Sequence, residues 1–175
     1  MWSKLFKKNS SEKNILVLGE TGCGKRSFLL CYKDGAALDP DKAPALPEFH
    51  TLTYNKKLDK SREQVPLVFT LNRTRADEMI PSMSKEVKYD LILILTDLSS
   101  EQAKSDLDYY SNYAKIHFPG VQTILVGTKQ DQKLESNEFN GLISTSVKTK
   151  HGFEKFEEQL LQSLNVTDKA GLELR

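Results

Sequence analysis

Short apolar runs alternate along this chain with stretches in which apolar residues recur at helical spacing. The runs are typical of strands and fall at 14–19, 51–58, 65–71, 91–95, 122–127 and, as a weaker one, 140–147. Amphipathic stretches typical of helices fall at 25–33, 103–114 and 153–164. Strands that alternate with helices indicate an α/β protein in which helices cover a mostly parallel sheet. The runs at 14–19 and 91–95 hold almost no polar residue, so we expect central strands covered on both faces.

Two long connections interrupt this pattern. Residues 34–50 carry three prolines and several acidic and small residues, and long loops of this kind usually serve function. The stretch 72–83 fits neither a helix nor a strand period. Because 175 residues leave little room for a second domain, we expect one domain at 13–165, a basic tail at 1–12 and a disordered tail at 166–175.

The composition excludes several classes of function. The chain has 25 Lys and Arg against 24 Asp and Glu, so its net charge of +1 gives no overall field to hold nucleic acid. Two cysteines cannot build a disulfide framework, which favours a reduced intracellular protein. No run has the length of a signal peptide or a spanning helix, and neither end carries a lipidation motif. The sequence therefore predicts a cytoplasmic protein.

The N-terminal residues leave a weak membrane contact open. Trp2, Leu5 and Phe6 fall at helical spacing opposite three lysines, as in a short interfacial anchor. A frayed cationic tail explains the same residues. We therefore expect either a frayed tail or a peripheral contact with a membrane.

A glycine-rich turn follows the first apolar run and precedes the first helix. It matches the pattern G-x-x-x-x-G-K completely, with the residues Gly19, Glu20, Thr21, Gly22, Cys23, Gly24 and Lys25. Glycines let backbone N–H groups point at a polyphosphate, while the helix N-terminus and the Lys25 ammonium offset its charge. The alternative is a turn that only tightens the junction between strand and helix.

The position after Lys25 departs from this pattern. A Ser or Thr hydroxyl normally follows the lysine and binds Mg²⁺, but this chain has Arg26 there and Ser27 one place later. A guanidinium cannot bind a cation, although it can contact phosphate oxygens or turn to solvent. Ser27 lies about 100° further round the helix, so it could take over only after a local shift. Mg²⁺ binding is therefore in doubt, and the sequence assigns no metal ligand.

Two further polar motifs follow strand ends. They are T-K-Q-D after the run 122–127, with Thr128, Lys129 and Asp131, and T-S-V-K after the last run, with Ser146, Val147 and Lys148. With the phosphate turn, and in this order, these motifs resemble those of the Ras superfamily of small GTPases over residues 13–165. The resemblance implies a three-layer P-loop NTPase fold and GTP or GDP as the bound nucleotide.

The resemblance also implies a role for each residue of the two later motifs. Asp131 would accept hydrogen bonds from the N1–H and the exocyclic amine of guanine, and Lys129 would cover the ring. Ser146, Val147 and Lys148 would line the far side of the base. A carboxylate accepts both donors that distinguish guanine from adenine, so the chemistry agrees with the resemblance.

The residues that sense the γ-phosphate in that family are missing. Small GTPases carry D-x-x-G after the third strand. At that place this chain reads L-N-R-T-R-A, from Leu71 to Ala76, so Asn72 directly follows the predicted strand. No glycine occurs between Gly35 and Gly120, so the motif has not moved along the chain. We therefore expect weak or absent GTP hydrolysis.

Other parts of the family pattern are ambiguous or shortened. The threonine that closes over Mg²⁺ could be Thr51, Thr53 or neither. Arg73 and Arg75 can be arginine fingers or a solvated, partner-binding surface. The segment 132–140 is too short for the helix that the family places there, so that edge of the sheet is expected to be lightly covered and open to partners.

Three hypotheses remain open. The first is a guanine-nucleotide-binding protein with slow or no hydrolysis that acts through protein partners. The second is a pseudoGTPase that binds no nucleotide and serves as an interaction scaffold. The third is an active P-loop NTPase in which Asp97, after the run 91–95, supports Mg²⁺.

Overall fold

The computed structural model describes residues 12–39, 50–57, 64–72 and 87–165. Predictions that concern other parts of the chain lie outside these residues. They include the N-terminal contact through Trp2, Leu5 and Phe6, the pair Arg73 and Arg75, and both tails. No helix within the described segments is long and apolar enough to cross a bilayer.

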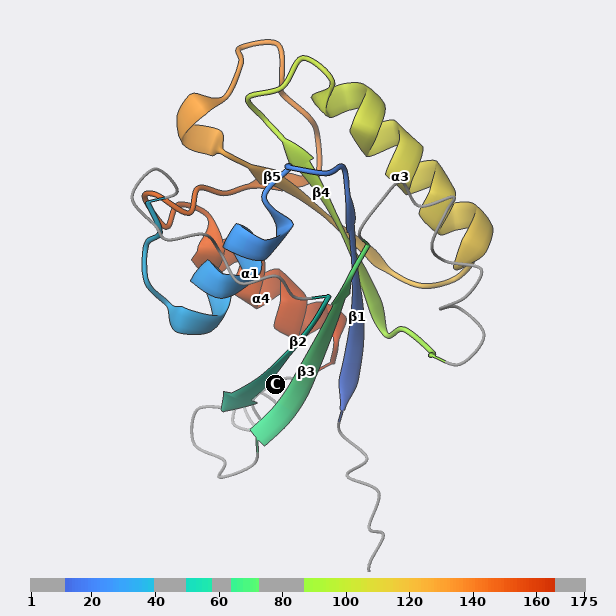
Figure 1. The fold of residues 1–175 in the computed structure, drawn as a ribbon. Coiled ribbons are helices and arrows are strands. Elements are labelled where there is room, and N and C mark those ends of the chain that lie inside the picture. The colour runs from blue at the N-terminus through green and yellow to red at the C-terminus, as the bar shows by residue number, and fades with distance from the viewer. Residues whose placement is uncertain (1–11, 40–49, 58–63, 73–86, 166–175) are drawn as a thin grey trace, which may run out of the picture.

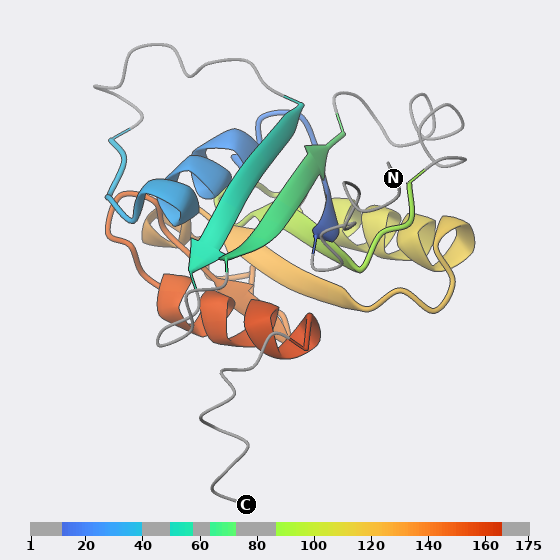
Figure 2. The ribbon, with the colours of Figure 1, turned by 90° about the horizontal axis from the view of Figure 1, so that it is seen from below.

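A single six-stranded sheet organises the described residues. Its strands are β1 (Lys13–Gly19), β2 (Thr51–Lys57), β3 (Gln64–Leu71), β4 (Leu91–Asp97), β5 (Thr123–Thr128) and β6 (Leu142–Ser144). They lie in the order β2-β3-β1-β4-β5-β6, and every neighbouring pair is parallel except the antiparallel pair β2 and β3. Figure 2 shows this antiparallel pair at one edge of the sheet.

Helices cover both faces of the sheet. They are α1 (Lys25–Asp34) and α4 (Phe153–Ser163) on one face and α3 (Ala103–His117) on the other (Figure 1). Successive residues of a strand point to opposite faces, so in β1 Ile15 and Val17 join the core under α1 and α4. Leu16 and Leu18 join the core under α3. The predicted three-layer α/β fold is confirmed.

Aromatic packing fixes the helices of one face against each other. The ring of Phe28 in α1 stacks on Phe153 at a centroid distance of 5.1 Å and meets Phe156 edge-on at 4.8 Å. Phe28 is completely buried, and aromatic pairs of this geometry stabilise a core beyond their buried area. The contact holds the start of α4 against α1, the helix that follows the glycine-rich turn.

The region between β5 and β6 is short, as predicted. It contains a 3₁₀ helix, η1 (Gln130–Gln132), and then irregular backbone up to Asn140. The last strand was expected at 140–147, but β6 has only three residues. It begins after Gly141, whose φ of 75° turns the chain. It ends at Ser144, after which the backbone leaves the ladder and the Ser146 N–H bonds to the His151 carbonyl.

Candidate functional site

All the predicted binding motifs lie at the end of the sheet where the parallel strands terminate, which we call its carboxyl edge. The carboxyl ends of parallel strands share an edge, and in this chain β1, β4 and β5 are neighbours there. The chain leaves β1 for a helix on one face and β4 for a helix on the other. Ligands of open α/β sheets bind where the topology changes in this way. The sheet order therefore brings the phosphate turn and T-K-Q-D together.

The phosphate loop, residues 19–25, has a backbone that requires glycine at particular positions. Gly24 has a φ of 98° and caps α1, in a region that L side chains rarely adopt. A Cβ on Gly19 would lie 2.7 Å from the Leu95 carbonyl oxygen. The first turn of α1 has neither a side-chain cap nor an acidic residue. A helix start of this kind can receive an anion.

Lys25 is held inside the phosphate loop. Its Nζ donates to the carbonyl oxygens of Gly19 at 2.7 Å and Glu20 at 3.0 Å. The side chain is 9% exposed, and this burial lowers the pKa of Lys25 below its usual value. The ammonium is therefore partly desolvated next to the helix N-terminus, where it can pair with an anion.

Two other members of the loop face away from its mouth. The Glu20 carboxylate accepts from the Thr21 N–H at 3.2 Å and from the Tyr110 hydroxyl of α3 at 3.5 Å. The prediction that Glu20 serves the ligand therefore applies to its backbone, because its side chain is turned to α3. Cys23 is buried in the core under α1, and burial raises the pKa of its thiol. Cys23 and Cys31 are both free and buried.

The residues at the expected metal position do not supply the expected ligands. Arg26 and Ser27 lie half-buried in the first turn of α1. At the end of β3, Asn72 holds the Gly19 N–H and carbonyl with its side-chain amide. No group of three or more His, Cys, Asp or Glu that could hold a metal ion occurs in the described part of the chain. The described donors therefore do not fit the hydroxyl and carboxylate that the resemblance implies for Mg²⁺.

The threonines proposed for the first switch lie in an edge strand. Thr51 and Thr53 belong to β2, pair with β3 and have exposed side chains. The central part of the preceding loop, residues 40–49, lies outside the described residues. The structure therefore adds no metal ligand from β2.

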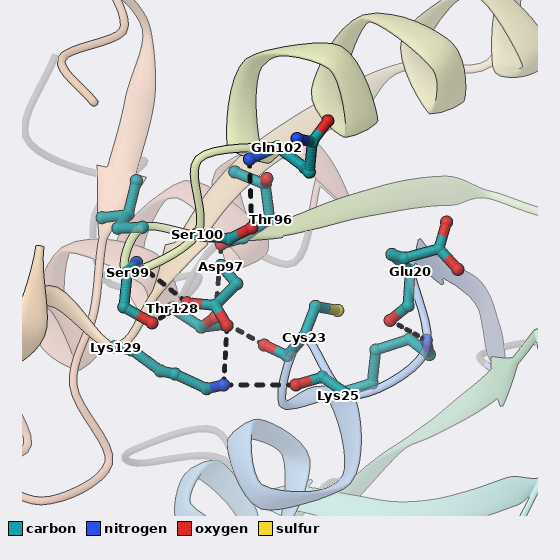
Figure 3. Close-up of polar contacts among 12 residues, drawn as sticks. Glu20, Cys23, Lys25, Thr96, Asp97, Ser99, Ser100, Gln102, Thr128 and Lys129 are labelled. Carbon is teal, nitrogen blue, oxygen red and sulfur yellow. Dashed lines mark hydrogen bonds and ion pairs between the residues drawn. The ribbon is translucent and has the colours of Figure 1, made fainter. Parts of the chain in front are cut away.

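Thr128 and Lys129 connect the end of β5 to the phosphate loop. The Thr128 hydroxyl donates to the Cys23 carbonyl at 2.5 Å. Lys129 Nζ donates to the Gly22 carbonyl at 3.3 Å and forms a 2.6 Å ion pair with Asp97 (Figure 3). Lys129 has a φ of 57°, which turns its side chain back over the loop. The phosphate loop and the T-K-Q-D motif are thus joined by direct contacts.

The hypothesis that Asp97 supports Mg²⁺ does not fit this geometry. Its carboxylate accepts from Lys129 and from the N–H and hydroxyl of Ser99 at 2.9 and 2.6 Å. Burial alone would raise the pKa of Asp97, but these hydrogen bonds outweigh burial and lower it. Asp97 is therefore ionised and committed to orienting Lys129.

Asp131 and the T-S-V-K loop face each other. The Ser146 hydroxyl donates to Asp131 Oδ1 at 2.7 Å, and the Gln130 N–H donates to the Thr145 carbonyl at 3.0 Å. The Val147 carbonyl accepts from the Leu38 N–H at 2.8 Å, which ties the chain after α1 to this loop. Lys148 borders a small hollow of about 290 Å³ there, beside Leu38.

Sequence reasoning missed three of these contacts. Asn72 was recognised only as a missing aspartate, Tyr110 only as a core residue, and Asp97 was given another role. The sequence places Asn72 directly after a strand, but only the strand order of the structure brings it to Gly19. Nothing local in the sequence indicates that Tyr110 reaches Glu20, since the two are 90 positions apart.

Comparisons with known proteins agree with the motifs. No protein-family model matches the chain. It is 28% identical over 115 residues to the Ras-related protein Rab-40B of Homo sapiens, covering 66% of this chain and 40% of that protein. It is 27% identical over 155 residues to a GTP-binding RHO-like protein of Candida albicans (strain WO-1), covering 82% of this chain and 44% of that protein. The chain thus spans less than half the length of these relatives. Together with the fold, these similarities support a relationship to the Ras superfamily.

Proposed function

We propose that this protein binds guanine nucleotides at the carboxyl edge of its sheet, hydrolyses GTP slowly or not at all, and acts through protein partners. The observation that carries the proposal is that Lys25 and Asp131 lie at one edge and that Lys129 connects their loops. An ammonium at a helix N-terminus suits phosphates, and a carboxylate suits the two donors of guanine. The GTP-binding relative supports the same class of ligand.

Weak hydrolysis is proposed because the chain lacks the groups that hydrolysis uses in small GTPases. After β3 it has Asn72 in place of the aspartate and no glycine before Gly120. The aspartate and glycine that sense the γ-phosphate in small GTPases are therefore missing from this sequence. The nucleotide would then serve mainly to stabilise the fold.

A minor role for Mg²⁺ belongs to the same proposal. Arg26 stands where a hydroxyl would bind the ion, and the Asn72 amide is bonded to Gly19. A guanidinium close to the phosphates can offset part of their charge instead. We therefore expect nucleotide to stay bound in chelator.

Partners are proposed at the lightly covered edge of the sheet. Within the described residues β6 is the last strand of the sheet, paired only with β5, and the segment between η1 and β6 contains no α-helix. Exposed strand edges accept other chains. We propose a cytoplasmic location, and Trp2, Leu5 and Phe6 provide the residues for a peripheral membrane contact.

A second candidate is a nucleotide-free pseudoGTPase, and one observation favours it. Lys25 is already bonded to two carbonyl oxygens of its own loop, and Asp131 to Ser146. A loop that satisfies its own ammonium can persist without phosphate. This candidate shares the fold and differs only in whether the edge holds a ligand.

Nucleotide released from the purified, denatured protein distinguishes the two candidates. Parallel samples prepared in magnesium and in chelator are separated by chromatography and quantified. Near-stoichiometric GDP or GTP in both samples is the expected result. Release only from the magnesium sample would contradict the minor role of Mg²⁺. Absence of nucleotide, with no binding of added GDP or GTP, would establish the nucleotide-free alternative.

A further inference from the structure

Asn72, the residue directly after β3, bonds to both polar groups of one phosphate-loop residue. The Gly19 N–H donates to Asn72 Oδ1 at 3.1 Å, and Asn72 Nδ2 donates to the Gly19 carbonyl at 3.2 Å. The Asn72 N–H also donates to the Val17 carbonyl at 3.2 Å. Asn72 is 5% exposed, so these bonds are shielded from water. The side chain therefore continues the β3 to β1 pairing past the end of the ladder and onto the phosphate loop.

The same Gly19 carbonyl also orients Lys25. Its oxygen accepts from Lys25 Nζ at 2.7 Å in addition to Asn72 Nδ2. A carbonyl oxygen has two lone pairs, so both are occupied here. The direction of this carbonyl, together with that of the Glu20 carbonyl, therefore positions the buried ammonium.

Tyr110 supports this arrangement from the opposite face of the sheet. It is completely buried in α3, and its hydroxyl donates to the Glu20 carboxylate of the loop at 3.5 Å. Burial and the nearby Glu20 charge raise the pKa of Tyr110, while a side-chain hydrogen bond with Asn72 opposes that rise. Asn72 is thus linked to β1, to α3 and to the phosphate loop.

Only a side chain with both a donor and an acceptor can make the pair of bonds to Gly19. An ionised carboxylate accepts from the Gly19 N–H but has no hydrogen for the Gly19 carbonyl. An amide whose oxygen and nitrogen are both committed to the backbone is also a poor ligand for a hard cation. The chemistry at this position therefore suits positioning and does not suit metal binding.

We propose that Asn72 is a positioning residue for phosphate binding: it fixes the Gly19 peptide, and through it the Lys25 ammonium, so that the loop receives a nucleoside diphosphate without a divalent cation. This inference rests on the proposed guanine-nucleotide function. It adds a specific residue to that function and a reason why the binding needs no Mg²⁺.

The test compares Asn72 with Asn137, the matched control. Asn137 is also buried, at 6% exposure, and its Nδ2 donates to the carbonyls of Leu98 and Ser100 at 2.8 Å each. GDP is titrated into nucleotide-stripped protein in magnesium and in chelator, and thermal unfolding of the stripped protein is recorded. We expect Asn72→Ala to weaken GDP binding about tenfold in both buffers. Asn137→Ala should lower thermal stability similarly and change GDP affinity less than about twofold.

The variant Asn72→Asp separates positioning from general destabilisation. A protonated carboxyl can donate to the Gly19 carbonyl as the amide does, whereas an ionised one cannot. The GDP affinity of Asn72→Asp, expressed relative to the parent protein at each pH, should therefore rise toward one as the pH falls through the pKa of the introduced carboxyl. The same ratio for Asn72→Ala should stay constant. If Asn72→Ala does not fold, Tyr110→Phe provides a milder change, with an expected loss of roughly threefold.

Three results would overturn the inference. The first is GDP binding by Asn72→Ala as tight as that of the parent protein. The second is a pH-independent ratio for Asn72→Asp, which would reduce Asn72 to a structural residue. The third is loss of parent binding in chelator. Failure of the proposed function looks different, since the parent protein itself would then bind neither GDP nor GTP, and this inference would fall with it.

Discussion

The Ser146 hydroxyl donates a 2.7 Å hydrogen bond to the Asp131 carboxylate across the gap between two loops. The bond comes from the loop after β6 and holds a side chain of η1, the 3₁₀ helix after β5. It fixes the rotation of a carboxylate that would otherwise be free at the surface, since Asp131 is exposed. A ligand that donates two parallel hydrogen bonds meets an acceptor that is already oriented.

Replacement of Asp131 tests this acceptor directly. Asp131→Asn exchanges one acceptor oxygen for a donor and removes the charge, so one of the two guanine donors loses its partner and meets another donor instead. We expect GDP affinity to fall about a hundredfold or more. Asp108→Asn on α3, where the aspartate pairs with Lys104 at the surface, should leave the affinity unchanged. A parent protein that prefers ATP over GTP in competition would contradict the assignment.

The Lys25 ammonium should make phosphate binding sensitive to alkaline pH. Because burial lowers the pKa of Lys25, the folded protein loses this proton below the usual value of 10.5. GDP affinity should decline as the pH rises through that lowered pKa. Below that lowered pKa, Lys25→Ala should weaken binding about a hundredfold or more, and the loss should shrink above it, whereas Lys104→Ala on α3 should not weaken binding.

The free energy of unfolding of the nucleotide-stripped protein should rise with alkaline pH, whereas the GDP affinity falls. Between the lowered pKa of Lys25 and 10.5, the unfolded chain binds more protons than the folded one. The contribution of Lys25 to the free energy of unfolding therefore increases with pH in that window. Denaturant titrations of the parent and Lys25→Ala would show it, and an identical alkaline slope in both would contradict burial of the ammonium.

A hydroxyl at position 26 should restore part of a metal dependence. Arg26→Ser supplies the ligand type that follows the lysine in other P-loops and removes a guanidinium that can contact phosphate. Magnesium should then raise GDP affinity more for Arg26→Ser than for the parent protein. The measurement is the ratio of GDP affinities in magnesium and in chelator. Equal ratios in both proteins would count against the view that Arg26 replaces the ion.

The ion pair of Asp97 and Lys129 should stabilise the fold down to acidic pH. The lowered pKa of Asp97 means that its contribution is present above the usual value of 3.8 and is lost as the pH falls through the lowered pKa. Asp97→Asn should reduce the free energy of unfolding at neutral pH by about 1 to 3 kcal/mol and flatten the decline below pH 3.8. Chemical denaturation at several pH values measures both effects. If the free energy of unfolding of Asp97→Asn declined below pH 3.8 as steeply as that of the parent protein, the carboxylate would not be paired in solution.

Gly152 and Gly141 provide a matched pair for backbone strain. Both have positive φ, 80° and 75°. A Cβ on Gly152 would lie 2.0 Å from the Ser144 carbonyl oxygen, whereas a Cβ on Gly141 meets nothing within 4 Å. Gly141→Ala should cost only the conformational strain, about 1–2 kcal/mol. Gly152→Ala should cost about 3 kcal/mol or more in the same unfolding measurement, because the β6 backbone has to move. Equal costs would contradict the close approach.

Much of the fold could be predicted because its signals are local. The apolar run 91–95 lies within β4, and α4 carries its apolar residues at helical spacing. The local sequence of each element therefore indicates which of its residues are buried. The end of β6 could not be predicted. Thr145 and Ser146 remain buried, but the strand pairing stops at Ser144. The Ser146 N–H bonds to the His151 carbonyl and its hydroxyl to Asp131.

By itself the sequence determined the glycines and lysine of the phosphate loop, the carboxylate of Asp131, and the presence of Arg26 and Asn72 at the positions where the resemblance implies a hydroxyl and an aspartate. These features depend on residue types at fixed short spacings, and the chemistry of glycine, lysine and carboxylate constrains them directly. Only the tertiary structure decided that Asn72 holds Gly19, 53 positions away, and that Asp97 pairs with Lys129, 32 positions away. The physical reason is the strand order β3-β1-β4-β5, which long-range packing establishes and which makes neighbours of residues that no local pattern connects.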